Sequence, residues 1–326
     1  MKEKVIVIGA TGYIGSSLCK ELHKENYAVY AVAFEKEYDH IQKYIESYIS
    51  LDLTNEENTQ SLVDFLCETD PRNVIIAVGA VNYTHNLKTS WQMNVIPIEN
   101  ILTAMRKAGN LKYKRILFLG SVASHGFNTL KNKENLITEK YDTFQKGRSI
   151  YCDVKRKATQ LFQQLIDEGF PGIIIEPGSL VGESLGGRET TNSGLIQKIL
   201  KGYPVLSGGA SYISLAVLIK GISSCLKKGK VGETYILGGE NLTMKEFALV
   251  VNKVYSDKYH QKKIKQSVIV LPRFISSVLG FFNLVINKQQ ALLGSSFHYI
   301  DNSKATNDFN YEHSNNDIVT AIKSSI

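Results

Sequence analysis

A short apolar run that leads directly into three regularly spaced glycines opens this chain. Residues 5–8 read Val-Ile-Val-Ile, and Gly9, Gly12 and Gly15 follow them. After the glycines, apolar residues between 14 and 22 recur at the spacing of one helical face. A buried strand, a tight turn and a helix in this order are typical of the first unit of a doubly wound parallel sheet.

This strand–turn–helix context also predicts nucleotide binding. Glycines in such a turn let the backbone approach a pyrophosphate closely, and the N–H groups of the helix start, near Tyr13 and Ile14, then face the anion. A tight turn without a ligand is the alternative.

Strand and helix patterns alternate regularly up to about residue 178. A long helix is expected over 89–108, with Pro97 bending or dividing it, and another from Tyr151 to Glu168. Capping boxes are predicted at Thr54–Glu57 and Thr243–Glu246. The expected strands cover 28–33, 48–51, 74–78, 116–119 and 173–175.

Beyond residue 178 strand and helix patterns no longer alternate regularly. Here we expect helices near 194–201, 212–226 and 244–256 and a strand at 234–237. The predicted fold class is therefore α/β. A Rossmann doubly wound parallel sheet would occupy residues 1–178. A smaller mixed α/β C-terminal substrate lobe would occupy residues 179–326, partly interleaved with the sheet edge.

A Tyr-x-x-x-Lys pattern lies near the middle of the chain, at Tyr151 and Lys155. Residues four apart share one face of a helix, so the phenol and the ammonium are expected side by side. A lysine placed there favours the phenolate, which makes the tyrosine a usable proton donor or acceptor near neutral pH. A solvated helix face is the alternative. Ser121, which follows a predicted strand, would lie near this pair, and Ser124 is the alternative serine.

Together these motifs resemble the extended short-chain dehydrogenase/reductase family, within the NAD-dependent epimerase/dehydratase superfamily. The resemblance extends over nearly the whole chain. In its C-terminal part, residues 232–239 (Gly-Glu-Thr-Tyr-Ile-Leu-Gly-Gly) and 300–305 (Ile-Asp-Asn-Ser-Lys-Ala) are similar to dihydroflavonol-reductase-like members.

The resemblance implies a role for each matched residue. Tyr151 is expected to be the general acid/base, Lys155 to lower its pKa and to bind the nicotinamide ribose, and Ser121 to hydrogen-bond the substrate oxygen. The residues expected to contact the cofactor are Gly9, Thr11, Gly12, Tyr13, Ile14, Gly15, Lys36, Asp52, Leu53, Gly79, Ala80, Asn94, Tyr151, Lys155, Pro177, Gly178 and Leu180.

The cofactor implied is NAD(P), and the end of the second strand bears on which form is used. Ala33 stands where relatives that prefer NAD carry an acid, and Phe34 stands where many NADP users carry an arginine. Glu35 could hold a ribose, whereas Lys36 or Lys43 could reach a phosphate. We predict NADP from this pattern.

The segment between Ser121 and Tyr151 is longer than the family pattern leads us to expect, so the loop 125–149 is predicted to shape the substrate site. His125 within it is expected to be structural or solvated and not a second acid/base group. Six aromatic residues are expected to line an apolar pocket, with membership of the core as the alternative: Phe127, Phe144, Tyr203, Phe274, Phe281 and Phe282.

The predicted function is an NAD(P)-dependent oxidoreductase acting on a carbonyl or alcohol of a small, fairly apolar molecule. A sugar-nucleotide epimerase would use the same three residues, but it must hold a diphosphate, for which arginine is suited. After residue 160 the chain has only Arg188 and Arg273. A 4,6-dehydratase is disfavoured, because Val122 and Ala123 stand where that subfamily carries Asp-Glu. A non-catalytic NAD(P)-sensing regulator is the further alternative.

Charge and cysteine content limit the partners. The net charge is +7, but the lysines are scattered, so a small-molecule substrate is expected and nucleic acid is not. The four cysteines show no metal spacing, which predicts no metal site and a reduced compartment. With no leader before the first strand, we expect a cytoplasmic protein that can form a homodimer. The apolar stretch 268–286 is predicted to be a buried or lid helix without stable membrane insertion, with a membrane-surface role as the alternative.

Overall fold

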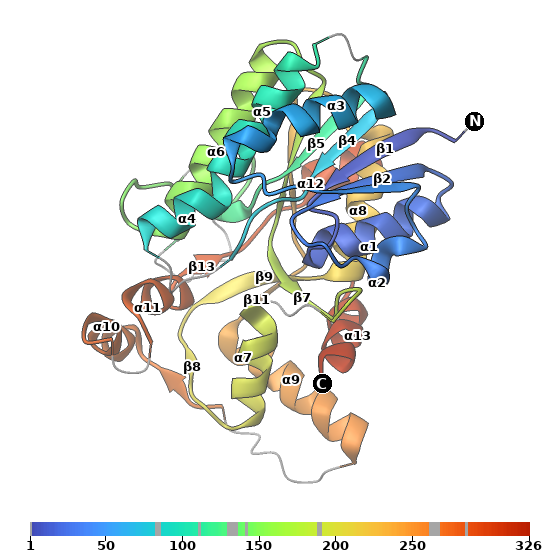
Figure 1. Ribbon diagram of the computed structural model, residues 1–326. Coiled ribbons are helices and arrows are strands. Elements are labelled where there is room, and N and C mark those ends of the chain that lie inside the picture. Colours follow the sequence, from blue (N-terminus) through green and yellow to red (C-terminus); the bar gives the residue numbers. More distant parts are fainter. Residues whose placement is uncertain are drawn as a thin grey trace.

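The computed structural model describes residues 2–81, 86–109, 112–128, 136–140, 143–187, 191–260, 268–283 and 286–326. It confirms the predicted fold class. A large parallel sheet carries helices on both faces, and a smaller mixed α/β part lies along one side of it (Figure 1).

The large sheet has seven strands in the order β10-β6-β5-β4-β1-β2-β3, and all neighbouring strands are parallel. Most of its strands are apolar runs buried on both faces, as parallel sheets covered by helices require. The bounds are β1 Lys4–Ile8, β2 Ala28–Ala33, β3 Ser47–Ser50, β4 Asn73–Ile76, β5 Arg115–Leu119, β6 Gly172–Pro177 and β10 Thr234–Leu237.

Two hydrophobic cores hold the helices onto this sheet. One face packs against α1 (Tyr13–Lys24), α2 (Asp39–Gln42), α8 (Leu215–Lys228) and α12 (Ser303–Phe309). The other face packs against α3 (Thr59–Thr69), α5 (Ile96–Lys107) and α6 (Ile150–Asp167). Shorter helices connect these layers: α4 (Leu87–Asn94), η1 (Glu56–Asn58) and η2 (Val122–His125).

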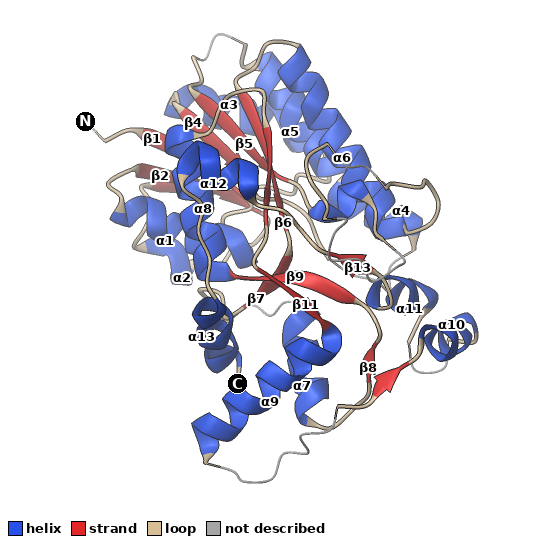
Figure 2. Ribbon diagram, turned by 180° about the vertical axis from the view of Figure 1, so that it is seen from behind, coloured by secondary structure: helices blue, strands red, loops and turns tan. Residues whose placement is uncertain are grey.

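The smaller part is organised around strand β9 (Gly209–Ser214), which pairs with β7 (Ser179–Val181), β11 (Glu240–Thr243) and β13 (Phe297–His298). Helices α7 (Thr191–Leu200), α9 (Met244–Tyr259) and α13 (Asn315–Ser325) share a third core. Strands β8 (Val205–Leu206) and β12 (Val270–Leu271) form a separate pair, and α10 (Arg273–Phe281) and α11 (Lys288–Gly294) follow. Figure 2 shows this part from the opposite side.

Segments beyond residue 178 contribute to both parts. Strand β10 is the edge strand of the large sheet, next to β6, and helices α8 and α12 cover one of its faces. The division at residue 178 stays a prediction, and three later elements lie with the N-terminal sheet.

Several predicted boundaries are confirmed. Pro97 divides the long helix: α4 ends at Asn94, α5 begins at Ile96, and Pro97 stands in the first turn, where a helix needs no backbone N–H. The capping box of Thr243 and Glu246 is present at the start of α9.

Two predicted helix starts are wrong. Residues 212–214 belong to β9, so α8 begins at Leu215 and not at 212. The capping box at Thr54 is also wrong, because the Thr54 hydroxyl donates to Asp52 and Asn55 caps η1 instead. The α-helix that follows begins only at Thr59.

The apolar stretch 268–286 is not a buried helix. Phe274 and Phe281 on α10 are 78% and 77% exposed, and small residues, Ser276 and Gly280, form the buried side. The same exposure excludes Phe274 and Phe281 from the core. Within the described ranges, no helix combines the length and the apolar character that crossing a bilayer requires.

Candidate active site

The carboxyl ends of β1 and β4 lie side by side where the strand order reverses, which is the ligand-binding crevice of doubly wound sheets. Gly9 follows β1 directly with φ +89°, and a Cβ there would lie 2.6 Å from the Ala77 carbonyl oxygen. A Cβ at Gly15 would lie 2.1 Å from the Gly9 carbonyl oxygen. Glycine is therefore needed at both positions for the turn and α1 to approach the sheet.

Helix α1 begins at Tyr13, with Gly12 as its N-cap. Its first turn, Tyr13 to Ser16, contains no acidic side chain, and the first N–H groups of a helix have no acceptor within the helix. The positive end of the helix dipole adds to this preference for an anion. The predicted glycine turn thus fits a pyrophosphate.

Side chains of α1 bind a segment that is distant in the sequence. Tyr13 donates its hydroxyl hydrogen to the Gly182 carbonyl at 2.6 Å, and Ser16 donates to the Leu185 carbonyl at 3.0 Å. These two hydrogen bonds hold the segment after β7 beside the glycine turn. Leu180, which was predicted to contact the cofactor, lies within β7 and is half-buried.

Glu35, just beyond the end of β2, approaches the same turn. Its carboxylate accepts a hydrogen bond from the Thr11 hydroxyl, and its carbonyl accepts one from Tyr48. Lys36 is exposed. The sequence left Glu35 as a candidate for holding the cofactor ribose, and Lys36 or Lys43 as candidates for holding its phosphate. Of these three, the acidic Glu35 lies against the glycine turn.

Asp52 and Leu53, which follow β3, are fixed by local hydrogen bonds. The Asp52 carboxylate accepts from the Thr54 N–H and hydroxyl, at 2.9 and 2.7 Å. The Leu53 carbonyl accepts from the Asn100 amide at 2.9 Å. These contacts set the conformation of the loop at the end of β3.

Gly79, Ala80 and Asn94 meet beyond the end of β4. The buried Asn94 side chain accepts from the Ala80 N–H at 3.1 Å and donates to the Ser90 carbonyl at 3.0 Å. A Cβ at Gly79 would lie 3.0 Å from Asn94 Oδ1 and 2.6 Å from Lys155 Nζ. The loop after β4 thus lies directly against the lysine of the predicted catalytic pair.

Ser121 and Tyr151 are brought together although 30 residues separate them. Tyr151 lies in the first turn of α6, which is capped by Ser149, and its hydroxyl lies 3.5 Å from Ser121 Oγ. Lys155 Nζ lies 5.8 Å from the centre of the Tyr151 ring, so both side chains share one face of the helix. Lys155 is 7% exposed.

Burial controls the protonation of this pair. It raises the pKa of Tyr151 to about 12, although the hydrogen bond with Ser121 acts in the opposite direction, and it lowers the pKa of Lys155 to about 8. Desolvation is the largest cause of the raised tyrosine pKa. The lowering of that pKa by Lys155 stays a prediction. At neutral pH Tyr151 is a protonated phenol beside a mostly charged lysine.

Ser124 and His125 contact a buried carboxylate. Ser124 donates to Glu176 of β6, and His125 Nε2 lies 2.5 Å from Glu176 Oε2. Glu176 and Ser124 are fully buried and His125 is nearly so, which excludes a solvated His125. Its structural role stays a prediction. Glu176 was missed, although an acid within the apolar run 173–177 is a signal for a buried polar partner.

Apolar groups surround the tyrosine. Phe127 and Cys152 are buried in a cluster with Ala123, and Phe144, Tyr151, Leu292 and Leu293 pack against it. Arg148 and Arg156 stack over Phe127 and Phe144, respectively. Of the six aromatic residues proposed for a pocket, two therefore lie beside Tyr151. Tyr203, Phe274, Phe281 and Phe282 are solvent-exposed.

Pro177 and Gly178 lie at the carboxyl end of β6. The Gly178 N–H donates to the Leu237 carbonyl at 2.9 Å, and a Cβ at Gly178 would lie 2.7 Å from the Ser211 carbonyl oxygen. This crowding requires glycine where the chain passes from the large sheet to the smaller part.

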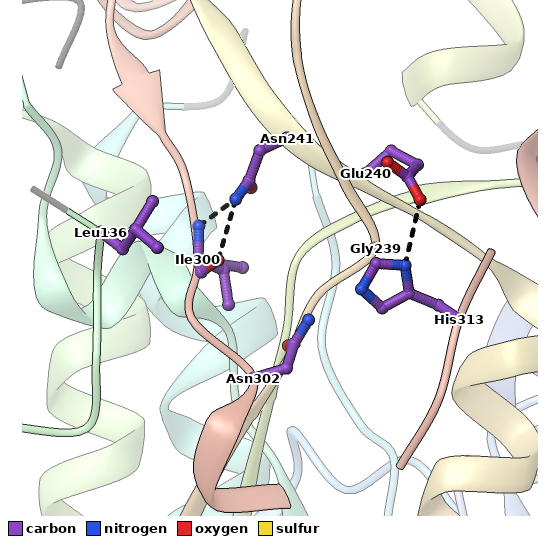
Figure 3. A pocket seen from close by; sticks show the side chains of 7 residues that line it. All are labelled: Leu136, Gly239, Glu240, Asn241, Ile300, Asn302 and His313. Atoms are coloured by element: carbon purple, nitrogen blue, oxygen red, sulfur yellow. Dashed lines mark hydrogen bonds and ion pairs between the residues drawn. The ribbon is translucent and has the colours of Figure 1, made fainter. Parts of the chain in front are cut away.

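A hollow of about 310 Å³ lies elsewhere, between β11 and the residues after β13 (Figure 3). His313 Nδ1 lies 3.2 Å from Glu240 Oε1, and the Asn241 side chain bonds both backbone groups of Ile300. Two of its walls come from Gly239 and from Ile300 and Asn302, within the C-terminal segments 232–239 and 300–305. None of the residues predicted to be catalytic or to bind the cofactor lines it. The described part of the chain holds no cluster of three or more potential metal ligands.

Comparisons with known proteins agree with this architecture. A profile of the NAD dependent epimerase/dehydratase family matches residues 5–211. A search of curated protein sequences gives no match.

Several solved structures share the fold over almost the whole chain. One is UDP-glucose 4-epimerase from Thermotoga maritima with UDP-glucose, at 15% identity and a TM-score of 0.74, covering 99% of this chain and 97% of that chain. UDP-glucuronic acid 4-epimerase from Bacillus cereus with NAD has 17% identity and a TM-score of 0.71, covering 98% and 96%. dTDP-glucose 4,6-dehydratase from Bacillus anthracis with NAD has 16% identity and a TM-score of 0.73, covering 99% and 96%.

These findings confirm the predicted superfamily, the NAD-binding Rossmann fold and the prediction that the protein is an enzyme, whereas similarity to dihydroflavonol reductases stays a prediction. The matched profile covers the glycine turn, Ser121 and the Tyr151–Lys155 pair, whose geometry is described above. The chain belongs to the NAD dependent epimerase/dehydratase family and is an enzyme of the extended short-chain dehydrogenase/reductase type.

Proposed function

We propose that this enzyme transfers a hydride between a nicotinamide cofactor and a carbonyl or alcohol on a small, fairly apolar molecule. The observation that carries the proposal is the contact of Tyr151 with Ser121 inside apolar surroundings. Phe127, Phe144 and residues of α11 border the tyrosine, so a substrate that reaches it meets hydrocarbon and aromatic surface. Two guanidinium groups, those of Arg148 and Arg156, lie over the two phenylalanine rings.

Each residue of the site has a distinct task in the proposed reaction. Tyr151, held protonated by its raised pKa, donates its proton to the substrate oxygen, and Ser121 donates a second hydrogen bond to the same oxygen. Lys155 stabilises the phenolate that forms as the proton leaves. The bound cofactor supplies the hydride. Ser121 is preferred over Ser124 because the Ser124 hydroxyl is buried against Glu176.

The contacts of Glu35 favour NAD over the NADP that we predicted from sequence. Its carboxylate bonds Thr11 in the glycine turn and lies 20 residues after Gly15, which is where an acid of dinucleotide-binding folds accepts the ribose hydroxyls of NAD. A 2′-phosphate at that place would meet negative charge. Glu35→Gln should therefore reduce the preference for NAD over NADP, measured by calorimetric titration with both cofactors.

The main test is an absorbance assay with NADH or NADPH and a panel of aldehydes and ketones of increasing apolar size. We expect net cofactor oxidation, faster with the apolar members, and none in Tyr151→Phe. If the protein binds the cofactor but turns over no member of the panel in either direction, the result would contradict this proposal and favour the non-catalytic NAD(P)-sensing regulator.

A sugar-nucleotide epimerase is the second candidate, and the full-length similarity to two UDP-sugar epimerases supports it. Against it, Arg273 lies in exposed α10, and Arg188 lies outside the described residues. Proton NMR of UDP-glucose or UDP-glucuronic acid incubated with the enzyme and NAD separates the two functions. An epimerase would convert the sugar with no net change in nicotinamide absorbance. A cytoplasmic location and a homodimer remain predictions.

A further inference from the structure

Helix α10 buries its small residues and exposes its large apolar ones, which is the reverse of the usual arrangement. Its buried side consists of small residues, and Gly280 is so close to α11 that a Cβ would lie 2.6 Å from the Ala291 methyl carbon. Its large apolar residues point outward instead: Phe274, Ile275, Val278, Phe281 and Phe282 are all exposed. Soluble helices normally bury their large apolar side.

The exposed residues form one patch. Positions 274, 275, 278, 281 and 282 follow helical spacing, and three of the five are phenylalanines exposed by 63% to 78%. Figures 1 and 2 both show α10 at the periphery of the molecule, beside α11. A contiguous apolar patch of this kind marks an interaction surface.

The charge around this patch identifies the kind of partner. The sequence from Val268 to Ile300 contains one arginine and one lysine, Arg273 and Lys288, and no aspartate or glutamate. Arg273 and Lys288, at the starts of α10 and α11, are both exposed. An anionic lipid surface offers an apolar layer beneath a negative one, which complements phenylalanines flanked by cations.

We propose that the α10 face docks onto the surface of an anionic lipid bilayer, with its phenylalanines at the level of the headgroups and upper acyl chains. This is peripheral binding and not insertion across the bilayer. A second copy of the chain fits less well, because pairing α10 faces would bring together two segments of like charge. The proposal does not depend on the substrate or on the direction of the reaction.

The helix pair also connects the docking surface to the catalytic centre. Leu292 and Leu293 of α11 pack against the cluster that contains Tyr151, and Ser149 at the start of α6 donates to Gln289 of α11 at 3.0 Å. A bilayer bound at α10 would therefore lie beside the apolar surroundings of the tyrosine.

The test is flotation of the full-length protein with vesicles of phosphatidylcholine, or of phosphatidylcholine containing about a third phosphatidylglycerol. We expect binding to the anionic vesicles at low salt and a loss of about tenfold or more in the double variant Phe274→Gln/Phe281→Gln. Leu249→Gln on α9, which replaces another exposed apolar residue, is the matched control and should bind as the wild type does. About 0.5 M salt should weaken binding.

Unchanged cofactor affinity and circular dichroism would show that the double variant is folded. No binding of the wild type to anionic vesicles, or equal binding by the double variant, would overturn the proposal. Equal affinity for neutral vesicles would overturn the part played by charge. A dimer in sedimentation velocity that dissociates in the double variant, without vesicle binding, would assign the face to a second copy.

Discussion

Replacing Lys155 with methionine should stabilise the folded protein while removing its activity. Lys155 is 7% exposed, and burial lowers its pKa from 10.5 to about 8. The folded state therefore holds the proton less tightly than the unfolded chain does. Because proton binding is linked to folding, this lysine lowers the free energy of unfolding at any pH at which it is protonated in the unfolded chain.

The size of the effect follows from that difference. A fall in pKa from 10.5 to about 8 corresponds to about 3 kcal/mol at neutral pH, at 1.36 kcal/mol per pKa unit. Methionine keeps an unbranched apolar stem of similar length and lacks the ammonium group that Lys155 places beside Gly79. We therefore expect Lys155→Met to gain about 1–3 kcal/mol in unfolding free energy.

The pH dependence gives the sharper test. Between about pH 8 and 10.5 the unfolded chain binds more protons at this lysine than the folded one, so the wild type regains stability as the pH rises. The advantage of the variant should be complete below about pH 8 and should disappear near pH 10.5. Groups that titrate equally in both proteins cancel from the comparison.

Urea unfolding of cofactor-free wild type and variant, at about pH 7 and about pH 10.5, measures this difference. Lys155→Arg is a suitable control, because it keeps the buried charge and should show no gain. A variant that is no more stable than the wild type at neutral pH, or whose advantage does not shrink at high pH, would refute the assignment of a desolvated charged lysine. Turnover should fall in the same variant.

Three further predictions test other parts of the site. Tyr151→Phe should abolish turnover and leave cofactor affinity unchanged by calorimetry, because only the proton donor is removed; kcat near the wild-type value would contradict the proposed mechanism. Gly12→Val should abolish cofactor binding in a folded protein, since a Cβ there meets only the Gly9 carbonyl oxygen at 3.1 Å; undiminished affinity would remove the pyrophosphate from this turn. Glu176→Ala should destabilise the fold by about 2–5 kcal/mol in urea unfolding, because it leaves buried polar groups without their acceptor; a neutral effect would show that water replaces the carboxylate.

The parts that the sequence predicted are those in which short-range pattern and geometry coincide. The four-residue spacing of Tyr151 and Lys155 on α6, and the glycines after β1, have few structural interpretations in an alternating strand–helix chain. The position of Ser121 just beyond the carboxyl end of β5 also brought it into reach of the tyrosine. Such local patterns are preserved on folding because helix and strand geometry determine them directly.

What the sequence could not give is the environment of those residues. Whether Lys155 lowers the pKa of Tyr151 depends on how much water the fold removes from both, and that was not readable from their spacing. The role of Ser124 likewise depends on Glu176, a residue 52 positions away. In the same way, the apolar composition of 268–286 predicted a buried or lid helix, whereas the close packing of Gly280 on α11 reveals which side of α10 faces outward.

The same removal of water connects the stability of this protein to its proposed chemistry. Burial holds Tyr151 as a protonated phenol and makes its proton available only if a nearby cation stabilises the phenolate. That cation is Lys155, which burial destabilises for the same reason. A more solvated site would remove the penalty on the lysine, but it would also weaken the interaction between the lysine and the phenolate, because water screens it. The fold therefore carries an unfavourable charge beside Gly79, and we expect substitutions that relieve it to trade activity for stability.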